Sequence, residues 1–582
     1  MLVELRRQVE DSLCDALRTA GYEADADDLG IEKPPEGVEA EIASSVAFEL
    51  ADGGDPTAVA EEISDAASAA DFDLIGGVET QGPYVNFRAS EAYLVRTLEE
   101  AQDEAYPTLP EKDEKVLLEH TSANPTGPLH VGRARNPIIG DSLARVLRAA
   151  GYDVEVEYYV NDMGRQVATI TWALEEFDEQ DVADIDEAHD KPDHDVVRYY
   201  RRANELLEGE EGEEEAERVE REIDALLRAL EDGDEAALEL VGDAVDRCLE
   251  GQLQSLERVG ASYDEFVRES EFVLDGSVDD VAQRLKDDTR SYEEDDAYAL
   301  DLSDHGIEKE LVFLRGDGTS LYTTRDLAHH IDKFERCDRA INVLGEDHKL
   351  QSEQLAAALD FLGYDRDPEA IFYSYVNLPE GKMSTREGTV VNTDDLLEEA
   401  VERARDEIQE RAQDRDRDVE SLEETAEAVG IGAVRYDIVA RQPEKPITFR
   451  WEEALNFDGQ HAPYVQYVGA RASGILEKSD AEPVDDAETA LDSLTTPEER
   501  ALLRKVGEMS AVVDDAADEL APHRLATYSR ELAECFNEFY RECPVIDADE
   551  GTERARLALV GASRVAIERS LGLVGVETPE AM

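Results

Sequence analysis

Cysteine is scarce in this chain of 582 residues. Its five cysteines are scattered at positions 14, 248, 337, 535 and 543, and no two form a Cys-x-x-Cys pair. That spacing supports neither a disulfide framework nor a cysteine zinc site, so we expect no structural metal. It is typical of proteins from a reducing compartment.

Long apolar runs are also missing. No stretch approaches the roughly 18 uninterrupted apolar residues that a membrane helix needs. The first residues, MLVELRRQVEDSLCDALRTAGY, carry acids throughout and lack the apolar core and cleavage site of a signal peptide. We therefore expect a cytoplasmic protein with no membrane partner.

Positive charge is heavily outnumbered. The chain has 142 acidic and 57 basic residues, a formal net charge of −85, and only 12 of the basic residues are lysines. Because the acids are spread along the whole chain, they indicate adaptation to a very salty cytoplasm. An acidic protein that avoids nucleic acid is the alternative. At about 1 M salt the Debye length is roughly 3 Å, so the charge does not exclude an RNA partner there.

The length predicts three or four domains. Residues 1–105 indicate a small α+β unit, with helices over 2–20 and 37–50 and a strand at GPYVNFRAS (82–90). A linker rich in proline and charge follows at 105–115. After about residue 400 the pattern is helical to the end.

The middle of the chain has the pattern of a parallel sheet. Strands over 116–121 and 152–160 flank a helix, which predicts a βαβ unit that binds its ligand at the carboxyl ends of the strands. The acidic stretch 176–260 is expected to be a solvated helical insertion with no chemistry of its own. Further strands are expected over 297–302, 310–314, 340–345 and 370–376, and RGDGTS (315–320) is expected to be a turn.

Two motifs carry the chemistry. The stretch SANPTGPLHVGRARNPIIGD (122–141) places His130 and Gly132 at the start of a helix. A helix start offers unpaired N–H groups and the positive end of a dipole, so we expect phosphates to bind there. The second stretch, GKMSTREGTVV (381–391), is a lysine–methionine–serine loop after the last sheet strand. Together, and in this order, they resemble the HIGH and KMSKS signatures of class I aminoacyl-tRNA synthetases.

Three further stretches narrow the resemblance. Arginyl-tRNA synthetases have stretches similar to YYVNDMGRQ, DGTSLYTTRDLAHH and HAPYVQYVGARASGIL. The helical anticodon-binding domain of that family resembles HRLATYSRELAECFNEFYRECPV. The resemblance covers nearly the whole chain, in the form found in halophilic archaea. It implies an α/β fold with a Rossmann-type parallel-sheet catalytic domain. It also implies an N-terminal domain (1–105) that reads the tRNA elbow, a catalytic domain (106–400) and an all-α anticodon-binding domain (401–582).

The resemblance also implies roles for residues at matching positions. The guanidinium of arginine presents a planar fork of donors, which a carboxylate pairs in bidentate fashion. The arginine set is Asn124, Glu269, Tyr322 and Asp326. The ATP set is Pro128, His130, Gly132, Gly345, Asp347, His348, Lys382 and Met383. The catalytic set is His130, Gly132, Arg133, Lys382, Ser384 and Arg386. The tRNA set is Asn86, Phe87, Tyr464, Gln466 and Tyr467, whose aromatics could equally be packing residues.

The chain departs from the two signatures in two places. Arg133 stands where the first motif often has a second histidine, and Thr385 stands where the second has its last lysine. We hypothesise that Lys382, Arg386 or Arg133 supplies the missing charge; a salt bridge to a helix neighbour is the alternative role for Arg133. Pro137 is expected to bend its helix, since proline removes a backbone donor.

The expected activity is that of an arginine–tRNA ligase. It would form arginyl-adenylate from L-arginine and ATP with Mg²⁺, and would transfer arginine to the 3′-terminal adenosine of tRNA(Arg), releasing pyrophosphate and AMP. We expect a monomer. Another class I synthetase such as the cysteinyl enzyme, a small-molecule nucleotidyltransferase and an acidic RNA-binding scaffold remain as alternatives.

Overall fold

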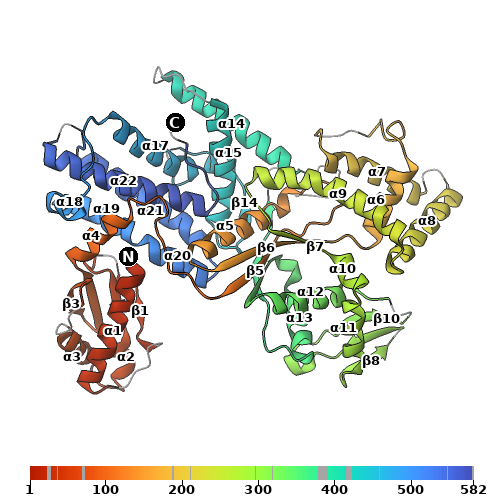
Figure 1. The fold of residues 1–582 in the computed structure, drawn as a ribbon, viewed down its shortest axis with the longest axis horizontal. Coiled ribbons are helices and arrows are strands. Elements are labelled where there is room, and N and C mark those ends of the chain that lie inside the picture. Colours follow the sequence, from red (N-terminus) through yellow and green to blue (C-terminus); the bar gives the residue numbers. More distant parts are fainter. Residues whose placement is uncertain are drawn as a thin grey trace.

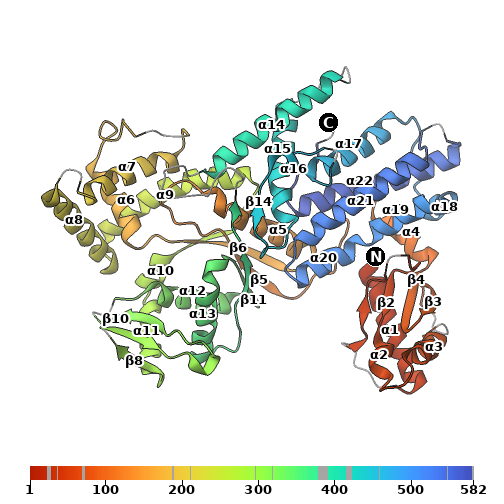
Figure 2. The same cartoon turned by 180° about the vertical axis from the view of Figure 1, so that it is seen from behind.

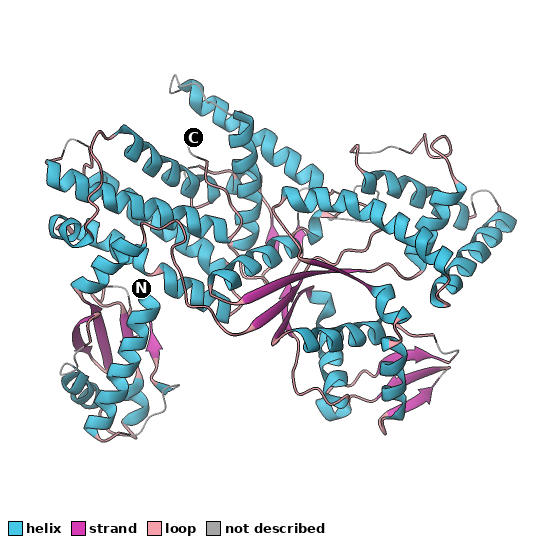
Figure 3. Cartoon of the chain, viewed as in Figure 1, coloured by secondary structure: helices cyan, strands magenta, loops and turns pink. Residues whose placement is uncertain are grey.

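A computed structural model gives the fold of the chain (Figure 1). It describes residues 1–582 except 23–27, 36, 68–71, 186–188, 210–211, 295, 317–318, 378–390, 415–421, 458, 547 and 580–581. Four separate sheets lie among many helices in the described part of the chain (Figure 3). Among the described residues, no helix combines the length and the apolar character that crossing a membrane requires.

The N-terminal unit is a four-stranded antiparallel sheet, in the order β1-β2-β4-β3, packed against helices. The predicted helix over 2–20 is confirmed as α1, whose apolar positions recur every four residues and are buried. The predicted helix over 37–50 is wrong, because residues 42–44 pair with β4 as strand β2 and only a short α2 follows. The elements are α1 Leu2–Ala20, β1 Ile31–Glu32, β2 Ile42–Ser44, α2 Val46–Leu50, α3 Pro56–Ala67, β3 Ile75–Gln81, β4 Tyr84–Ala89 and α4 Glu91–Glu100.

The central sheet has five strands in the order β12-β11-β5-β6-β7, and every neighbouring pair is parallel. The predicted Rossmann-type sheet is therefore confirmed. β5 lies in its centre, so the connection that follows β5 opens at the middle of the carboxyl edge. The elements are β5 Lys115–Glu119, α5 Arg135–Ala149, β6 Asp153–Val160, α6 Arg165–Glu176, β7 Glu265–Arg268, α10 Glu269–Leu274, α12 Tyr322–Arg336, β11 Arg339–Gly345, α13 Lys349–Phe361 and β12 Glu369–Tyr373.

Another antiparallel sheet, of three strands, lies apart from the central one, and α12 contacts both sheets (Figure 1). The strands expected over 297–302 and 310–314 do form, but they pair with each other and with β8 rather than with the parallel sheet. Part of the expected turn 315–320 lies outside the described residues. The elements are α11 Ser277–Asp287, β8 Ser291–Glu294, β9 Ala297–Leu300 and β10 Leu311–Arg315.

The acidic insertion is helical, as predicted. Its last helix, however, is not merely solvated: α9 buries one face that includes Val241, Val245 and Leu256. The insertion extends away from the helical C-terminal part (Figure 1). Its helices are α7 Pro192–Leu207, α8 Glu213–Glu231 and α9 Glu235–Arg258.

The C-terminal part is almost entirely helical, as predicted, and the N-terminal unit packs against it (Figure 2). The Tyr106 hydroxyl donates to the Val506 carbonyl at 2.9 Å across this junction. The elements are β13 Val376–Asn377, α14 Thr393–Asp414, α15 Leu422–Val439, β14 Ile447–Thr448, α16 Trp451–Ala454, α17 Ala462–Lys478, α18 Ala487–Ser493, α19 Pro497–Gly507, α20 Met509–Asp518, α21 His523–Glu542 and α22 Glu550–Leu573.

Candidate active site

His130 and Gly132 lie at the carboxyl edge of the central sheet, in the connection from β5 to α5. His130 precedes a 3₁₀ turn (Val131–Arg133), and its Nδ1 accepts a hydrogen bond from the Gly132 amide at 3.0 Å. The amides of Val131, Arg133 and Ala134 donate to backbone carbonyls. The expectation of unpaired amides at this point is therefore wrong, because the tight turn and a neighbouring segment already use them. Binding of an anion here must depend on side chains.

The His130 ring has one defined donor. Burial, followed by the positive charge of Arg133, lowers the pKa of His130, so the ring is neutral at neutral pH. Because Nδ1 accepts from an amide, the single ring proton is on Nε2. His130 thus presents an N–H donor on its free side.

Arg133 is the cation nearest to this donor by sequence. Its side chain is exposed and makes no ion pair with any residue that the structure describes. Its charge acts on His130, on Asp347 just after β11 and on Tyr375 just after β12. A salt bridge to a helix neighbour is therefore not its role among the described residues.

Pro137 does not interrupt α5. The helix begins at Arg135 and continues to Ala149, so Pro137 is its third residue. A proline in the first turn costs no intrahelical hydrogen bond, since that N–H would have no partner inside the helix. The expected bend is therefore not needed.

The chain that follows the lysine–methionine–serine stretch is held beside His130. The Val131 amide donates to the Val391 carbonyl at 3.1 Å, and the Thr393 amide donates to the Leu129 carbonyl at 2.8 Å. His130 and Asn392 form an antiparallel bridge between these segments. Four predicted residues of that stretch, together with Thr385, lie outside the described residues: Lys382, Met383, Ser384 and Arg386.

Tyr322 and Asp326 are one turn apart at the start of α12, as predicted. Tyr322 is 62% exposed. Asp326 is an exposed residue, yet the surrounding protein desolvates its carboxyl group, and this effect, followed by the negative charges of Glu269 and Glu119, raises the pKa of Asp326 to about 7. A cation bound at this position would stabilise the ionised form of Asp326.

Glu119 is a carboxylate that the sequence analysis missed. It is the last residue of β5, at the same carboxyl edge as His130. Burial opposes its ionisation, but the Lys333 ammonium, with which it forms an ion pair, and then His329 lower the pKa of Glu119 to about 2. It therefore stays ionised, and its negative charge acts on Asp326. Its place at the end of the central strand was the signal available in the sequence.

Glu269 is buried, as the first residue of α10. Its Oε1 lies 2.9 Å from Nη1 of Arg325, and its Oε2 has no hydrogen-bond partner among the residues that the structure describes. Burial raises the pKa of Glu269, which Arg325 only partly offsets. One half of this carboxylate is therefore already used by an arginine of the chain itself.

Asn124 and Pro128 lie in the turn between β5 and His130. The Asn124 side chain is exposed and its Nδ2 lies 3.4 Å from Oε1 of Gln166, while Pro128 is half-buried. Asn136 of α5 ties this turn to the sheet: it accepts from the Thr121 amide at 2.6 Å and donates to the Val343 carbonyl of β11 at 2.9 Å.

Gly345 is the last residue of β11, which lies next to β5 in the sheet, and Asp347 and His348 follow it. A side chain at Gly345 would meet Oδ1 of Asp347 at 2.5 Å, so the glycine allows this close approach. The Tyr375 hydroxyl donates to the same oxygen at 2.6 Å. Burial alone would raise the pKa of Asp347, but this hydrogen bond and the charge of His348 lower it. His348 itself is exposed.

The residues predicted to contact tRNA are mostly buried. Phe87 is fully buried in the N-terminal core, and Asn86 is 5% exposed. In α17, Gln466 is buried and donates to the carbonyls of Ala428 and Glu577. The two tyrosines of this helix, Tyr464 and Tyr467, are half-buried; the first accepts a hydrogen bond from Asn537, and Arg471 lies over the ring of the second.

Comparison with protein families divides the chain into three matches. Residues 4–89 match the arginyl tRNA synthetase N terminal domain. Residues 97–451 match the family described as tRNA synthetases class I (R), catalytic domain. Residues 465–582 match the DALR anticodon binding domain.

Similar proteins match over their whole length. The chain is 54% identical to an arginine–tRNA ligase of Haloarcula marismortui and 48% identical to one of Methanocella arvoryzae, with 100% of both chains covered in each case. The solved structure of Thermus thermophilus arginyl-tRNA synthetase superposes with a TM-score of 0.83 at 30% identity, covering 99% of this chain and 100% of that one.

Proposed function

Because the chain belongs to the arginyl-tRNA synthetase family of class I synthetases, we propose that its carboxyl sheet edge activates L-arginine with ATP and transfers it to tRNA(Arg). The chain is an arginine–tRNA ligase. The observation that carries the site assignment is the placement of two carboxylates, Asp326 and Glu119, at the same edge as His130.

Arginine recognition rests on the carboxylates. Asp326 would pair the substrate guanidinium, and Tyr322 would cover it from the outer side of α12. Glu119, whose two oxygens already bind Ser122 and Lys333, would add its negative charge. Asn124 would meet the α-amino end of arginine. Glu269 could contribute only through Oε2, because Arg325 holds its other oxygen.

Activation joins the arginine carboxylate to the α-phosphorus of ATP and releases pyrophosphate. Charge gathers on the phosphoryl oxygens in the transition state, and fixed donors stabilise it. His130 would donate from Nε2, with Gly132 leaving room for the nucleotide. Arg133 would hold a phosphate together with Lys382 and Arg386, near Met383 and Ser384. Gly345, Asp347, His348 and Pro128 would frame the adenosine.

Magnesium would arrive with ATP. Mg²⁺ keeps several waters and phosphate oxygens as ligands, so it needs few ligands from the protein. Asp347 fits this need, because its lowered pKa keeps it ionised and only Oδ1 accepts a hydrogen bond from Tyr375. The ion would offset the charge of the phosphates.

Transfer to tRNA needs no covalent enzyme intermediate. The terminal ribose hydroxyl of tRNA would attack the carbonyl of arginyl-adenylate and release AMP. We divide the chain into an elbow-binding domain (1–105), a catalytic domain (106–400) and an anticodon-binding domain (401–582). The RNA-contacting residues would be Tyr464 and Tyr467, with Gln466, Asn86 and Phe87 supporting the RNA surfaces from inside. A cytoplasmic monomer would suffice for both steps.

The first test is ATP–pyrophosphate exchange in molar KCl. Each of the twenty amino acids is supplied, with and without total tRNA from an organism that grows in high salt. We expect exchange with arginine, and only when tRNA is present. Exchange with another amino acid would assign the site to a different class I synthetase. If the folded protein supports no exchange with any amino acid, the result would favour the RNA-binding scaffold.

A further inference from the structure

One face of the insertion helix α9 contacts the backbone on both sides of His130. Nε2 of Gln252 donates to the carbonyls of Asn124 at 3.0 Å and Gly127 at 2.7 Å, in the turn that leads to His130. Ser255, three residues later, donates from Oγ to Oδ1 of Asp394 at 2.8 Å. Residues three apart share one helix face. α9 therefore joins the turn before His130 to the start of α14.

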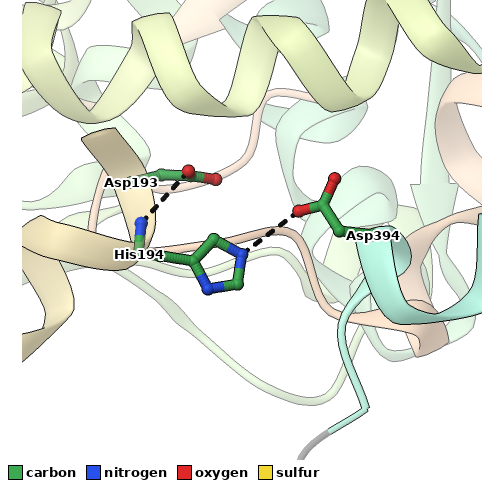
Figure 4. Close-up of side chains that lie close together, drawn as sticks. All are labelled: Asp193, His194 and Asp394. Atoms are coloured by element: carbon green, nitrogen blue, oxygen red, sulfur yellow. Dashed lines mark hydrogen bonds and ion pairs between the residues drawn. The ribbon is translucent and has the colours of Figure 1, made fainter. Parts of the chain in front are cut away.

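The start of α7 completes this contact. The other oxygen of Asp394, Oδ2, lies 2.8 Å from Nζ of Lys191 and 3.2 Å from Nε2 of His194. Figure 4 shows Asp193, His194 and Asp394 converging from α7 and α14 beneath a neighbouring helix. These three side chains and that of Lys191 are each at most 13% exposed. We call Lys191, Asp193, His194, Ser255 and Asp394 the α14 anchor.

The positive charge in this anchor comes from a side chain of the protein, Lys191, and not from a metal ion. Asp193, His194 and Asp394 have the side chains of a metal site, with ligand atoms within 4.8 Å of one another. However, the Lys191 ammonium lies 2.8 Å from Asp394 and 3.6 Å from Asp193, where it balances both carboxylates. A metal ion would have to displace it. Although burial opposes it, hydrogen bonding from His194, Lys191 and Ser255 holds the pKa of Asp394 well below its usual range.

The anchor reaches His130 through two residues of backbone. Thr393, directly before Asp394, donates its amide to the Leu129 carbonyl, and Asn392 forms the bridge with His130. Asp395 supports the same segment, since its carboxylate accepts from the Asn392 amide at 3.0 Å and lies 2.9 Å from Nε2 of His189. A shift of α14 would therefore move residues 391–393, the segment that is hydrogen-bonded to the backbone on both sides of His130.

We infer that Lys191, Gln252 and Ser255 are positioning residues for ATP: the acidic insertion holds both backbone segments that flank His130. This deepens the proposed function and rests on it for the identity of the nucleotide. Lys191 and Ser255 bond to Asp394 and not to Asn124, Asp326 or Glu119, whereas Gln252 also holds the Asn124 carbonyl. Loss of the anchor should therefore affect the use of ATP and leave the use of arginine almost unchanged.

The test compares Lys191→Met and Ser255→Ala with a matched control, Arg247→Met. Arg247 forms an ion pair with Asp195, so it also joins α9 to α7, but it does not contact Asp394. In ATP–pyrophosphate exchange we expect Lys191→Met to raise the KM for ATP about tenfold, because misplacing a binding group by a fraction of an ångström is enough. Ser255→Ala should shift the same constant less. The KM for arginine should change less than about twofold in all three variants, because none of the substitutions alters the carboxylates Asp326 and Glu119 of the arginine site.

A second measurement is independent of activity. Hydrogen–deuterium exchange should be faster at the Val131 and Thr393 amides in Lys191→Met than in Arg247→Met, because their hydrogen bonds cross between the two segments. An unchanged KM for ATP, or equal exchange in Lys191→Met and Arg247→Met, would overturn the inference. Failure of the proposed function itself would show differently, as a wild-type protein with no arginine-dependent exchange.

Discussion

Asp326 is an exposed residue whose carboxyl group lies in surroundings that disfavour its charge. Because desolvation of this group and the negative charges of Glu269 and Glu119 raise the pKa of Asp326 to about 7, the free site holds this carboxylate only partly ionised near neutrality. A bound guanidinium favours the ionised form. Arginine binding and proton release from Asp326 are therefore linked.

This linkage predicts a pH dependence. Below pH 7 Asp326 gains a proton and loses its attraction for the guanidinium, so the KM for arginine should rise by up to about tenfold per pH unit. Above pH 7 it should level off. Steady-state exchange between pH 5.5 and 8.5 measures this, and a KM for arginine that is flat below pH 7 would contradict it.

Asp326→Asn tests the same group directly. The amide keeps the shape but removes the charge, so kcat/KM for arginine should fall about 100-fold while the KM for ATP changes little. Glu335→Gln is the control, because Glu335 is an exposed carboxylate on the same helix. An equal loss in both variants would count against the assignment of Asp326.

Arg133→Ala tests the phosphate role of the exposed cation. Since Arg133 makes no ion pair with described residues, its loss should lower the rate of activation about 100-fold with almost no change in thermal midpoint. Arg133→Lys keeps the charge and should retain more of the rate. Equal losses of rate and stability in Arg133→Ala would remove the clamp hypothesis.

At the scale of elements, α7 and α9 pack through a glycine. A Cβ at Gly251 of α9 would meet Oδ1 of Asp193 at 2.2 Å and the Asp193 backbone nitrogen at 2.4 Å. Gly251→Ala should therefore destabilise the protein by about 1–3 kcal/mol, because backbone must move. Gly242→Ala is the matched control on the same helix, with nothing within 4 Å, and should be neutral or slightly stabilising. Thermal unfolding of both variants in molar KCl measures the difference; equal midpoints would contradict the packing argument.

The elements also show what a sequence can and cannot predict. Periodic or uniformly apolar segments such as α1, β5 and β6 were predicted within one or two residues, because their patterns are local. Sheet membership was not: β9 and β10 pair in a separate sheet, and the short β7 was missed, because pairing depends on distant residues. In the site, the spacing of Tyr322 and Asp326 predicted their shared face. Glu119 was missed because its only signal was its place at the end of a strand, which does not stand out among 142 acids spread along the chain.

At the scale of the whole molecule, charge repulsion opposes folding. A net charge of −85 repels itself over about 10 Å at 0.1 M salt but over only about 3 Å at 1 M. The thermal midpoint should therefore rise steeply between 0.1 and 2 M KCl. Matched sucrose solutions control for general exclusion effects. A midpoint that does not respond to KCl would mean that the acidic surface is not a source of instability.

The pairing of residues 129–131 with residues 391–393 has a consequence for biosynthesis. The ribosome adds about 5–20 residues per second, so roughly 13–50 s pass between the synthesis of the two segments. During that interval the growing chain already carries His130 and Arg133 but has no partner strand to hold them. A nascent chain should therefore gain nucleotide affinity in a single late step, after residue 393 leaves the exit tunnel.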